Sequence, residues 1–335
     1  MPNLSAHVIT RRTKLMSRSL TDHLIPIFFA TDDAYAPFLG VSIRSMLDSA
    51  DKNYFYRIHI LTSTMNEENR KKLAALEGDN SKISFDNPEK KLEHLMGSLS
   101  LRDYYSVATY YRLFIADMFP QYDKVLYIDS DTVIPGDISK MYHTDIGNNL
   151  VGAVPESVML NAPFDEYAEK VVGVPYNKYF NAGILLMNLR EFRQSRIENR
   201  FVNLLSRKKF PVAQDQDYLN VLCQGRVYYF GHEWNLAPVE GLTAKAPCIV
   251  HYKMASRPWN YDGVLFGEYF WKYAETSGYY EDICKIKSSR TPADAENDQK
   301  VFDGLVALAI DEIARAEEEK ERAKKSRIFR TLFAF

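Results

Sequence analysis

The hydrophobic residues of this chain form short apolar runs that alternate with segments of helical period. After the first run, Leu39, Ile43 and Leu47 recur four positions apart, which places them on one side of a helix. The segment from Thr64 to Glu67 predicts the start of a second helix, because its spacing forms a capping box. This alternation predicts an α/β protein with a mostly parallel sheet between helices. The predicted strands are residues 25–30, 56–61, 82–85, 124–128, 150–154, 183–187 and 248–252.

The two ends of the chain depart from this alternation. The first residues are basic and without apolar period, and they lack the continuous apolar core of a signal peptide. Near the other end, a polar stretch precedes an apolar helical stripe from Phe302 to Ile313. We therefore predict four parts. They are a mobile basic lead-in (1–23), a main domain (24–285), a linker (286–300) and a C-terminal amphipathic helix with a basic and aromatic tail (301–335).

The composition is that of an ordinary globular protein, with 46% hydrophobic and 26% charged residues among 335. The formal net charge of −2 provides no basic field, so we expect no nucleic-acid partner. No stretch reaches the roughly 18 uncharged apolar residues of a membrane-spanning helix. The odd number of distant cysteines (Cys223, Cys248 and Cys284) favours reduced thiols and a cytoplasmic location.

Two carboxylates, Asp129 and Asp131, directly follow the apolar run 124–128. Residues two apart in an extended chain point the same way, so both can face one divalent cation at the end of a sheet. A pair of solvated loop aspartates is the alternative. His251 lies near the end of the run 248–252, and its imidazole beside two carboxylates favours Mn²⁺ over Mg²⁺. A packed or surface histidine is the alternative for this residue.

Two further polar segments suit a polyhydroxylated ligand, although each also has a purely structural explanation. Asp215, Gln216 and Asp217 stand where a helix is expected to begin, and Asp215 could simply cap that helix. The segment 181–183 has the sequence Asn-Ala-Gly, whose small residues allow close approach of the backbone to a ligand or form a turn. Neither segment by itself decides between these interpretations.

Six short motifs, taken in their order along the chain, are far more specific than any one of them. The whole set resembles glycosyltransferase family 8, the retaining sugar-nucleotide transferases. It is more similar to the bacterial lipopolysaccharide galactosyl- and glucosyltransferases than to the glycogenins, and the resemblance covers about residues 24–285, the expected catalytic domain. The motifs are Asp32-Asp33, Thr109-Tyr110-Tyr111-Arg112, Asp129-Ser130-Asp131, Phe180-Asn181-Ala182-Gly183, Asp215-Gln216-Asp217 and His251 followed by Arg257-Pro258-Trp259.

The resemblance implies an A-type glycosyltransferase fold with a Rossmann-like sheet, a UDP-sugar donor, and Mn²⁺ or, in its place, Mg²⁺. It also implies a role for each matching position. The metal ligands are Asp129, Asp131 and His251; the nucleotide contacts are Ala30, Asp32, Tyr35 and Arg257; the donor-sugar contacts are Arg112, Asn181, Ala182, Asp215 and Gln216; the acceptor contacts are Glu156 and Tyr104. Gln216 and Asp215 are the expected catalytic residues. The chain departs from the family where Met254 replaces a glycine and Arg257 replaces a lysine.

The function implied by the resemblance is transfer of a hexose from UDP-glucose or UDP-galactose to a hydroxyl of a glycan or glycolipid, with retention. We expect a role in cell-surface polysaccharide or lipopolysaccharide synthesis. Retention normally uses a carboxylate nucleophile, and the amide of Gln216 is a poor one, so we expect same-face attack with Asp215 positioning the sugar. The alternatives are a non-catalytic sugar-nucleotide-binding scaffold and a nucleotidyltransferase.

The tail, residues 320–335, combines six basic side chains with aromatic residues and leucine. This composition suits an anionic membrane surface, because cations meet the headgroups and apolar side chains enter the acyl boundary. We therefore expect peripheral attachment to the inner face of the cell membrane, near a lipid-linked acceptor. A solvated tail is the alternative, and we assign the stripe 302–313 to packing on protein.

Overall fold

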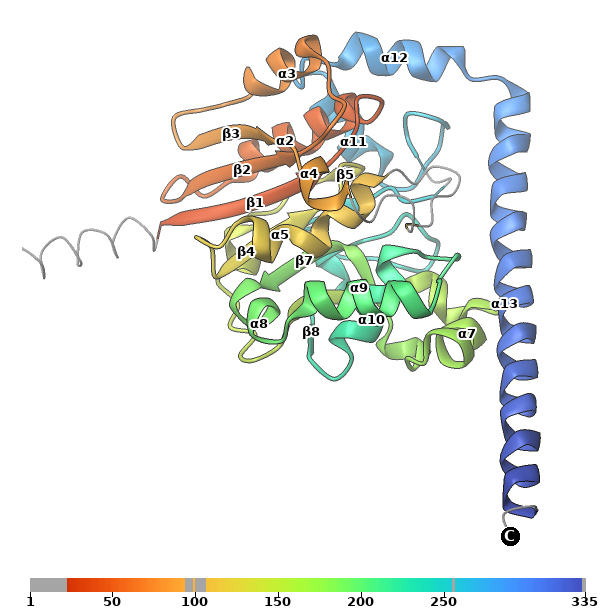
Figure 1. Ribbon diagram of the computed structural model, residues 1–335. Helices are drawn as coiled ribbons and strands as arrows, with labels where there is room; N and C mark the ends of the chain where they lie inside the picture. Colours follow the sequence, from red (N-terminus) through yellow and green to blue (C-terminus); the bar gives the residue numbers. More distant parts are fainter. Residues whose placement is uncertain (1–22, 94–98, 100–106, 255–256, 333–335) are drawn as a thin grey trace, which may run out of the picture.

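The computed structural model describes residues 23–93, 99, 107–254 and 257–332, with side chains described as far as residue 325 (Figure 1). Tyr104 and residues 1–22 of the expected lead-in lie outside the described residues. Among the described residues, no helix combines the length and the apolar character needed to cross a membrane.

Seven strands form one sheet through the body of the protein. They are β1 (Leu24–Ala30), β2 (Phe55–Leu61), β3 (Ser81–Asp86), β4 (Lys124–Ile128), β6 (Val151–Pro155), β7 (Phe180–Asn188) and β8 (Val227–Tyr229). Their order across the sheet is β3-β2-β1-β4-β7-β6-β8. All neighbouring pairs are parallel except those of β7, which runs antiparallel to both β4 and β6. The prediction of a mostly parallel sheet is confirmed.

Helices cover both faces of the sheet, as predicted (Figure 1). The helices of the body are α2 (Ala36–Ser49), α3 (Glu67–Ala74), α4 (Glu89–Leu92), α5 (Ile115–Met118), α6 (Ser139–Tyr142), α7 (Phe164–Tyr167), α8 (Leu189–Gln194), α9 (Ile197–Arg207), α10 (Asp215–Cys223), α11 (Gly267–Ala274) and α12 (Tyr280–Ser289). Short 3₁₀-helices form η2 (Val107–Phe114), η3 (Ser157–Leu160), η5 (Tyr176–Lys178) and η6 (His232–Trp234), and a π-helical turn forms η4 (Ala168–Val172).

The sheet separates two hydrophobic cores, because successive side chains of a strand point to opposite faces. In β4, Val125 and Tyr127 belong to one core, and Leu126 and Ile128 belong to the other. Helices α8, α9 and α10 pack on the first core, and α2, α11 and α12 pack on the second. Strand β4 is thus buried on both faces, which explains why its sequence is a continuous apolar run.

Two short strands, β5 (Thr132–Val133) and β9 (Val250–His251), lie outside the central sheet. They pair antiparallel, with Thr132 opposite His251. The predicted strand 248–252 is therefore wrong in its extent and does not join the central sheet. The backbone N–H groups of residues 248 and 249 donate to the carbonyl of Glu233 instead.

Two helix starts also differ from the sequence-based expectations. Asn66 rather than Thr64 caps α3, because the Asn66 side chain accepts a backbone N–H of the first turn. The expected linker 286–300 is helical: it forms the end of α12 and the first turns of α13 (Pro292–Leu332). Thr291 and Asp294 form a capping box at the start of α13. The polar composition of residues 286–300 therefore belongs mostly to exposed helix and not to an irregular connection. The division into domains stays a prediction.

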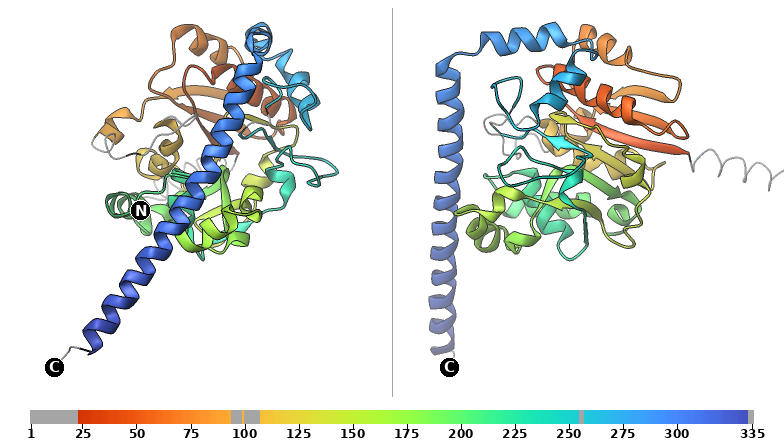
Figure 2. Two further views of the ribbon diagram at one scale, coloured as in Figure 1. Left: turned by 90° about the vertical axis from the view of Figure 1, so that its right-hand side faces the viewer. Right: turned by 180° about the vertical axis from the view of Figure 1, so that it is seen from behind.

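Helix α13 crosses the face of the body and extends beyond it (Figures 1 and 2). Its middle packs on the first core through Ala309 and Ile313, which are buried. Further along, Glu317 binds Lys170 of η4 at 2.7 Å. The expectation that the stripe 302–313 packs on protein holds for these buried positions, whereas Phe302 and Ile310 remain exposed.

Candidate active site

A cavity of about 240 Å³ opens at the carboxyl ends of β1 and β4, the edge where open α/β sheets bind ligands. Its lining comes from segments far apart in the sequence, including β1, η2, β7, the start of α10 and the first part of α13. Every site residue that the resemblance implied lines this cavity, except Tyr104, which lies outside the described residues. The fold therefore brings the six motifs together in one place.

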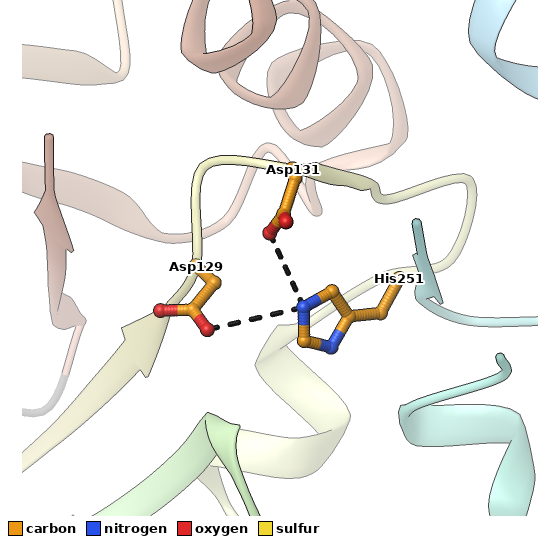
Figure 3. A group of neighbouring side chains, drawn as sticks. All are labelled: Asp129, Asp131 and His251. Atoms are coloured by element: carbon orange, nitrogen blue, oxygen red, sulfur yellow. Dashed lines mark ion pairs between the residues drawn. The ribbon is translucent and has the colours of Figure 1, made fainter. Parts of the chain in front are cut away.

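Asp129, Asp131 and His251 form a compact cluster on one wall of the cavity (Figure 3). Each offers one ligand atom, and these atoms all lie within 4.8 Å of one another. The Nε2 of His251 lies 3.2 Å from Asp131 Oδ1 and 3.8 Å from Asp129 Oδ2. His251 is buried and both carboxylates are mostly enclosed, so the alternatives of solvated aspartates and a surface histidine are wrong.

Backbone pairing places the three residues of this cluster. Asp129 follows the last residue of β4, and its N–H donates to the carbonyl of Gly183 on the antiparallel strand β7 (2.7 Å). The chain then turns into β5, which pairs with β9 and so carries His251 back to Asp131. Burial would raise the pKa of Asp131, but the charges of His251 and Arg257 outweigh burial and lower it.

The space beside this cluster depends on Gly183. A Cβ at this position would lie 2.4 Å from His251 Cε1 and 2.5 Å from Asp129 Oδ2, both far inside contact distance. Only glycine therefore lets β7 pass so close to the two side chains. Two carboxylates and an imidazole converge there, and this is a donor set that Mn²⁺ accepts, so the residues present fit a divalent cation. The alternative that residues 181–183 form a turn is wrong, since they are extended within β7.

A second asparagine, Asn235, orients His251 and was missed by the sequence analysis. Its Oδ1 lies 3.1 Å from His251 Nδ1, so an Nδ1 proton donated to Asn235 fixes the ring with Nε2 toward the carboxylates, as the atom that a cation would contact. The Nδ2 of Asn235 donates to Asn181 Oδ1 at 2.8 Å, and Asn181 Nδ2 donates to Glu156 at 2.6 Å. No sequence motif surrounds Asn235, and it lies 16 residues before His251, so the sequence alone does not indicate their contact.

Arg112 lines the cavity and joins the cluster of Asp129, Asp131 and His251 to the start of α10. Its Nη2 donates to Asp129 at 3.0 Å, and its Nε lies 3.0 Å from Asp215 Oδ2. Its Nη1 donates to the carbonyl of Ala182. Burial would lower the pKa of Arg112, but Asp129 and Asp215 outweigh burial and raise it. Arg112 thus holds the carboxylates of Asp129 and Asp215 in place.

Asp215 and Gln216 begin α10 at the edge of the cavity. The residue before them, Gln214, has a φ of 49°, an uncommon conformation for a residue with a side chain, which turns the chain sharply into the helix. Burial raises the pKa of Asp215 to about 6, although Arg112 and the hydroxyl of Thr109 oppose this. Gln216 Oε1 accepts the N–H of Ala182 at 2.9 Å.

Asp217 has a different role from its neighbours in the motif. Its carboxylate accepts hydrogen bonds from the hydroxyls of Tyr167 (2.8 Å) and Tyr179 (2.6 Å) and from the N–H of Ala213 (3.0 Å). It is fully buried and does not line the cavity. Burial raises its pKa to about 6, although these hydrogen bonds oppose the shift. Asp217 therefore fixes the loop before α10 rather than contacting a ligand.

Glu156 is buried on the cavity wall and carries a charge there. It pairs with Lys253, a residue that the sequence analysis did not assign to the site. Burial alone would raise the pKa of Glu156, but Lys253 and the hydrogen bond from Asn181 lower it to about 2. The carboxylate is therefore ionised and held in one position.

At the other end of the cavity, Asp32 and Tyr35 follow β1. Asp32 Oδ1 accepts the N–H of Tyr35 at 3.1 Å, and the guanidinium of Arg257 lies 5.9 Å from the Tyr35 ring centre. Trp259 anchors the Arg257 loop by stacking on Phe38, with ring centres 4.1 Å apart. Ala30 lines the same end.

Met254 opens the loop between His251 and Arg257 and lines the cavity as well. It has a φ of 59°, in the left-handed region that favours glycine. The family often has glycine at this position, so the backbone keeps the glycine-like conformation although the side chain is methionine. The substitution thus places a methionine side chain in the cavity lining.

Comparisons with known proteins agree with this geometry. The profile described as "Glycosyl transferase family 8" matches residues 26–263. The lipopolysaccharide 1,2-glucosyltransferase of Escherichia coli K12 is 25% identical over 288 residues, which cover 78% of this chain and 80% of the relative. A galactosyltransferase, LgtC, solved with donor and acceptor sugar analogs, is 27% identical with a TM-score of 0.65, covering 82% of this chain and 100% of LgtC. The bifunctional glycosyltransferase WbbM is 29% identical with a TM-score of 0.71, covering 80% of this chain and 52% of WbbM.

Proposed function

Because the chain belongs to glycosyltransferase family 8, we propose that it transfers a hexose from a UDP-sugar to a hydroxyl of a glycan or glycolipid, with retention. The observation that carries the proposal is the cluster of Asp129, Asp131 and His251 in the same cavity as Asp215 and Gln216. The glucosyl- and galactosyltransferases among the relatives support UDP-glucose or UDP-galactose as donor, and lipopolysaccharide or a related cell-surface polysaccharide as product.

The three clustered side chains would hold a divalent cation, Mn²⁺ in preference to Mg²⁺, because an imidazole joins the carboxylates. When bound, such a cation would neutralise charge on the departing diphosphate. Arg257 would add its forked guanidinium to the same diphosphate, and Tyr35 would stack on the uracil base. Asp32 would accept a hydrogen bond from the base.

Neither candidate nucleophile is well suited to attack the anomeric carbon, although Asp215 Oδ2 accepts no hydrogen bond from the described residues. Gln216 is an amide whose oxygen accepts the N–H of Ala182, and Asp215 is bound by Arg112 and Thr109. We therefore infer same-face attack. The bond from the anomeric carbon to the UDP oxygen breaks, the acceptor oxygen forms a bond on the same face, and its proton passes to a phosphate oxygen of UDP. A glycosyl adduct on Asp215 or Gln216, trapped with a slow donor and seen by mass spectrometry, would overturn this route.

The test of the proposed function is hydrolysis of UDP-glucose and UDP-galactose by the full chain with Mn²⁺. We expect one donor to be hydrolysed, and Asp131→Asn to abolish the reaction without lowering the melting temperature by more than a few degrees. The matched control is Asp262→Asn, because Asp262 is exposed, does not line the cavity and pairs only with the surface residue Lys287 among the ion pairs described. A chain inert toward both donors would favour the scaffold alternative, and release of pyrophosphate from a nucleoside triphosphate would favour a nucleotidyltransferase.

The basic end of α13 would attach the enzyme to an anionic membrane surface. Residues 320–325 are exposed, and this end of the helix lies beyond the body (Figures 1 and 2). Each basic residue near such a surface contributes about 1 kcal/mol of binding free energy, which several together make substantial. Co-sedimentation with vesicles containing anionic lipid should be strong for the full chain and weak for a chain ending at Glu319. Equal binding by both chains would rule the anchor out.

A further inference from the structure

The first part of α13 forms part of the cavity wall. Val301, Phe302 and Leu305 line the cavity although they follow the family match by more than 35 residues. Leu305 packs against the core that includes apolar residues of η3, α7 and the segment before α10, so α13 continues an apolar surface. The other apolar members of this wall are Val158, Met159, Phe164 and Val212.

Helix α13 is fixed on both sides of the cavity, so this wall has a defined position. On the side of the nucleotide end, Asp298 is buried and accepts hydrogen bonds from Tyr261, which follows Arg257 by four residues, and from Arg290. On the other side, Ala309 and Ile313 are buried in the core and Glu317 binds Lys170. Between these two attachments, Phe302 keeps 39% of its surface exposed and faces the cavity.

The polar residue that α13 contributes to the cavity lining is Asp298, whose Oδ2 already accepts hydrogen bonds from Tyr261 and Arg290. The rest of this wall is apolar, so it does not suit the diphosphate, the ribose or the hydroxyls of a donor sugar. Those groups have polar partners elsewhere in the cavity, from Asp32 at one end to Asp215 and Gln216 near the middle. Exposed aromatic and aliphatic side chains gain free energy when they cover an apolar or flat group. The remaining substrate in the proposed reaction is the acceptor.

We propose that α13 forms the apolar wall of the acceptor site, with Phe302 as a specificity-determining residue that contacts an apolar or aromatic group attached to the acceptor sugar. This inference rests on the proposed function and adds the chemical class of the acceptor. A hydroxyl entering beside Glu156 would leave the rest of the acceptor near α13, because Glu156 caps η3, whose Met159 belongs to the core on which Leu305 of α13 packs. The acceptor is thus recognised by its aglycone as well as by its sugar.

The experiment compares acceptor probes that differ only in the aglycone. Methyl and p-nitrophenyl β-glucosides and β-galactosides are tested with the full chain, Mn²⁺ and UDP, and binding is measured by isothermal titration calorimetry. We expect the p-nitrophenyl form of at least one sugar to bind about tenfold more tightly than its methyl form. In Phe302→Ala this ratio should fall close to one. The matched control is Ile310→Ala on the same helix, where the ratio should stay unchanged, since Ile310 is 52% exposed and does not line the cavity.

The outcomes separate this inference from the proposed function. If the wild-type chain hydrolyses no UDP-sugar, the proposed function fails. If it does hydrolyse one, the inference is overturned by equal binding of methyl and p-nitrophenyl forms, by binding of neither, or by a ratio that Phe302→Ala leaves unchanged. Tighter binding of the p-nitrophenyl form in Phe302→Ala would also overturn it, because the ring would then obstruct the site instead of contacting the acceptor.

Discussion

Replacing Gly183 by alanine should disable the proposed cation site while leaving most of the fold intact. The added Cβ would lie 2.4 Å from His251 Cε1 and 2.5 Å from Asp129 Oδ2, whereas ordinary contact begins near 3.4 Å. Each of the two side chains must therefore retreat by about 1 Å. Neither has an easy path, because His251 is held by Asn235 at 3.1 Å and Asp129 is held by Arg112 at 3.0 Å.

The size of the effect follows from the tolerance of metal sites. Ligand distances in such sites hold to within about 0.2 Å, so shifts of about 1 Å take two of the three ligands out of range. We expect the affinity for Mn²⁺ to fall by roughly 100-fold, as when ligand-orienting residues are lost. Overpacking should lower the free energy of unfolding by about 1–3 kcal/mol.

The assay is a Mn²⁺ titration by calorimetry in the presence of UDP, together with urea denaturation. Gly152→Ala is the matched control, because its Cβ would lie 2.5 Å from Phe230 Cε2 in the same sheet, away from the cluster. The control should be destabilised to a similar degree while its Mn²⁺ affinity stays unchanged. If Gly183→Ala binds Mn²⁺ within twofold of the wild type, the assignment of this space to a cation is wrong.

Three further predictions concern single side chains around the site. Asn235→Ala should weaken Mn²⁺ binding roughly tenfold with little change in melting temperature, because it frees the ring of His251; an unchanged Mn²⁺ titration would contradict this. Folding raises the pKa of Asp217 from 3.8 to about 6, so the folded protein binds this proton more tightly than the unfolded chain does. The protonated carboxyl therefore contributes stability at low pH, and this contribution is lost as the pH rises from about 4 to about 6. Asp217→Asn should therefore remove a pH-dependent change in the free energy of unfolding on the order of 2–3 kcal/mol in that window. Urea denaturation of the wild type and the variant at pH 4, 5, 6 and 7 would refute this prediction if both showed the same dependence on pH. Met254→Gly should raise the free energy of unfolding by up to about 1 kcal/mol, because it relieves a left-handed conformation, and urea denaturation that shows a loss instead would mean that the methionine side chain stabilises the loop.

Local patterns in the sequence predicted six of the seven strands of the central sheet and missed the short edge strand β8. The apolar run 124–128 became β4, buried on both faces, and the motif Asp129-Ser130-Asp131 follows directly at its carboxyl end, where open α/β sheets bind ligands. Local patterns were less reliable at boundaries. The capping box predicted at Thr64 is replaced by a cap at Asn66, whose side chain accepts the N–H of Asn69 and also contacts Asp33 in the folded chain.

The order of the six motifs, through the resemblance to a family, also predicted which residues would line one cavity. What the tertiary structure alone decided is how those residues are held. Asn235 orients His251 from 16 residues away, and Lys253 pairs with Glu156 across 97 residues. Contacts of this kind have no local signature, because hydrophobic periodicity reports which side of an element is buried and not which distant side chain it meets.

Helix α13 is the clearest case in which local sequence patterns did not predict the tertiary contacts. From its polar first turns, the sequence predicted a linker, because exposed helix faces and irregular connections share a composition of charged and small residues. Only the packed structure places Asp298 against Tyr261, 37 residues earlier, and so brings Phe302 to the cavity. The sequence by itself thus determined most of the strands, the motifs and the resemblance to the family, whereas the part of the cavity wall formed by α13 came from contacts between segments that no local pattern connects.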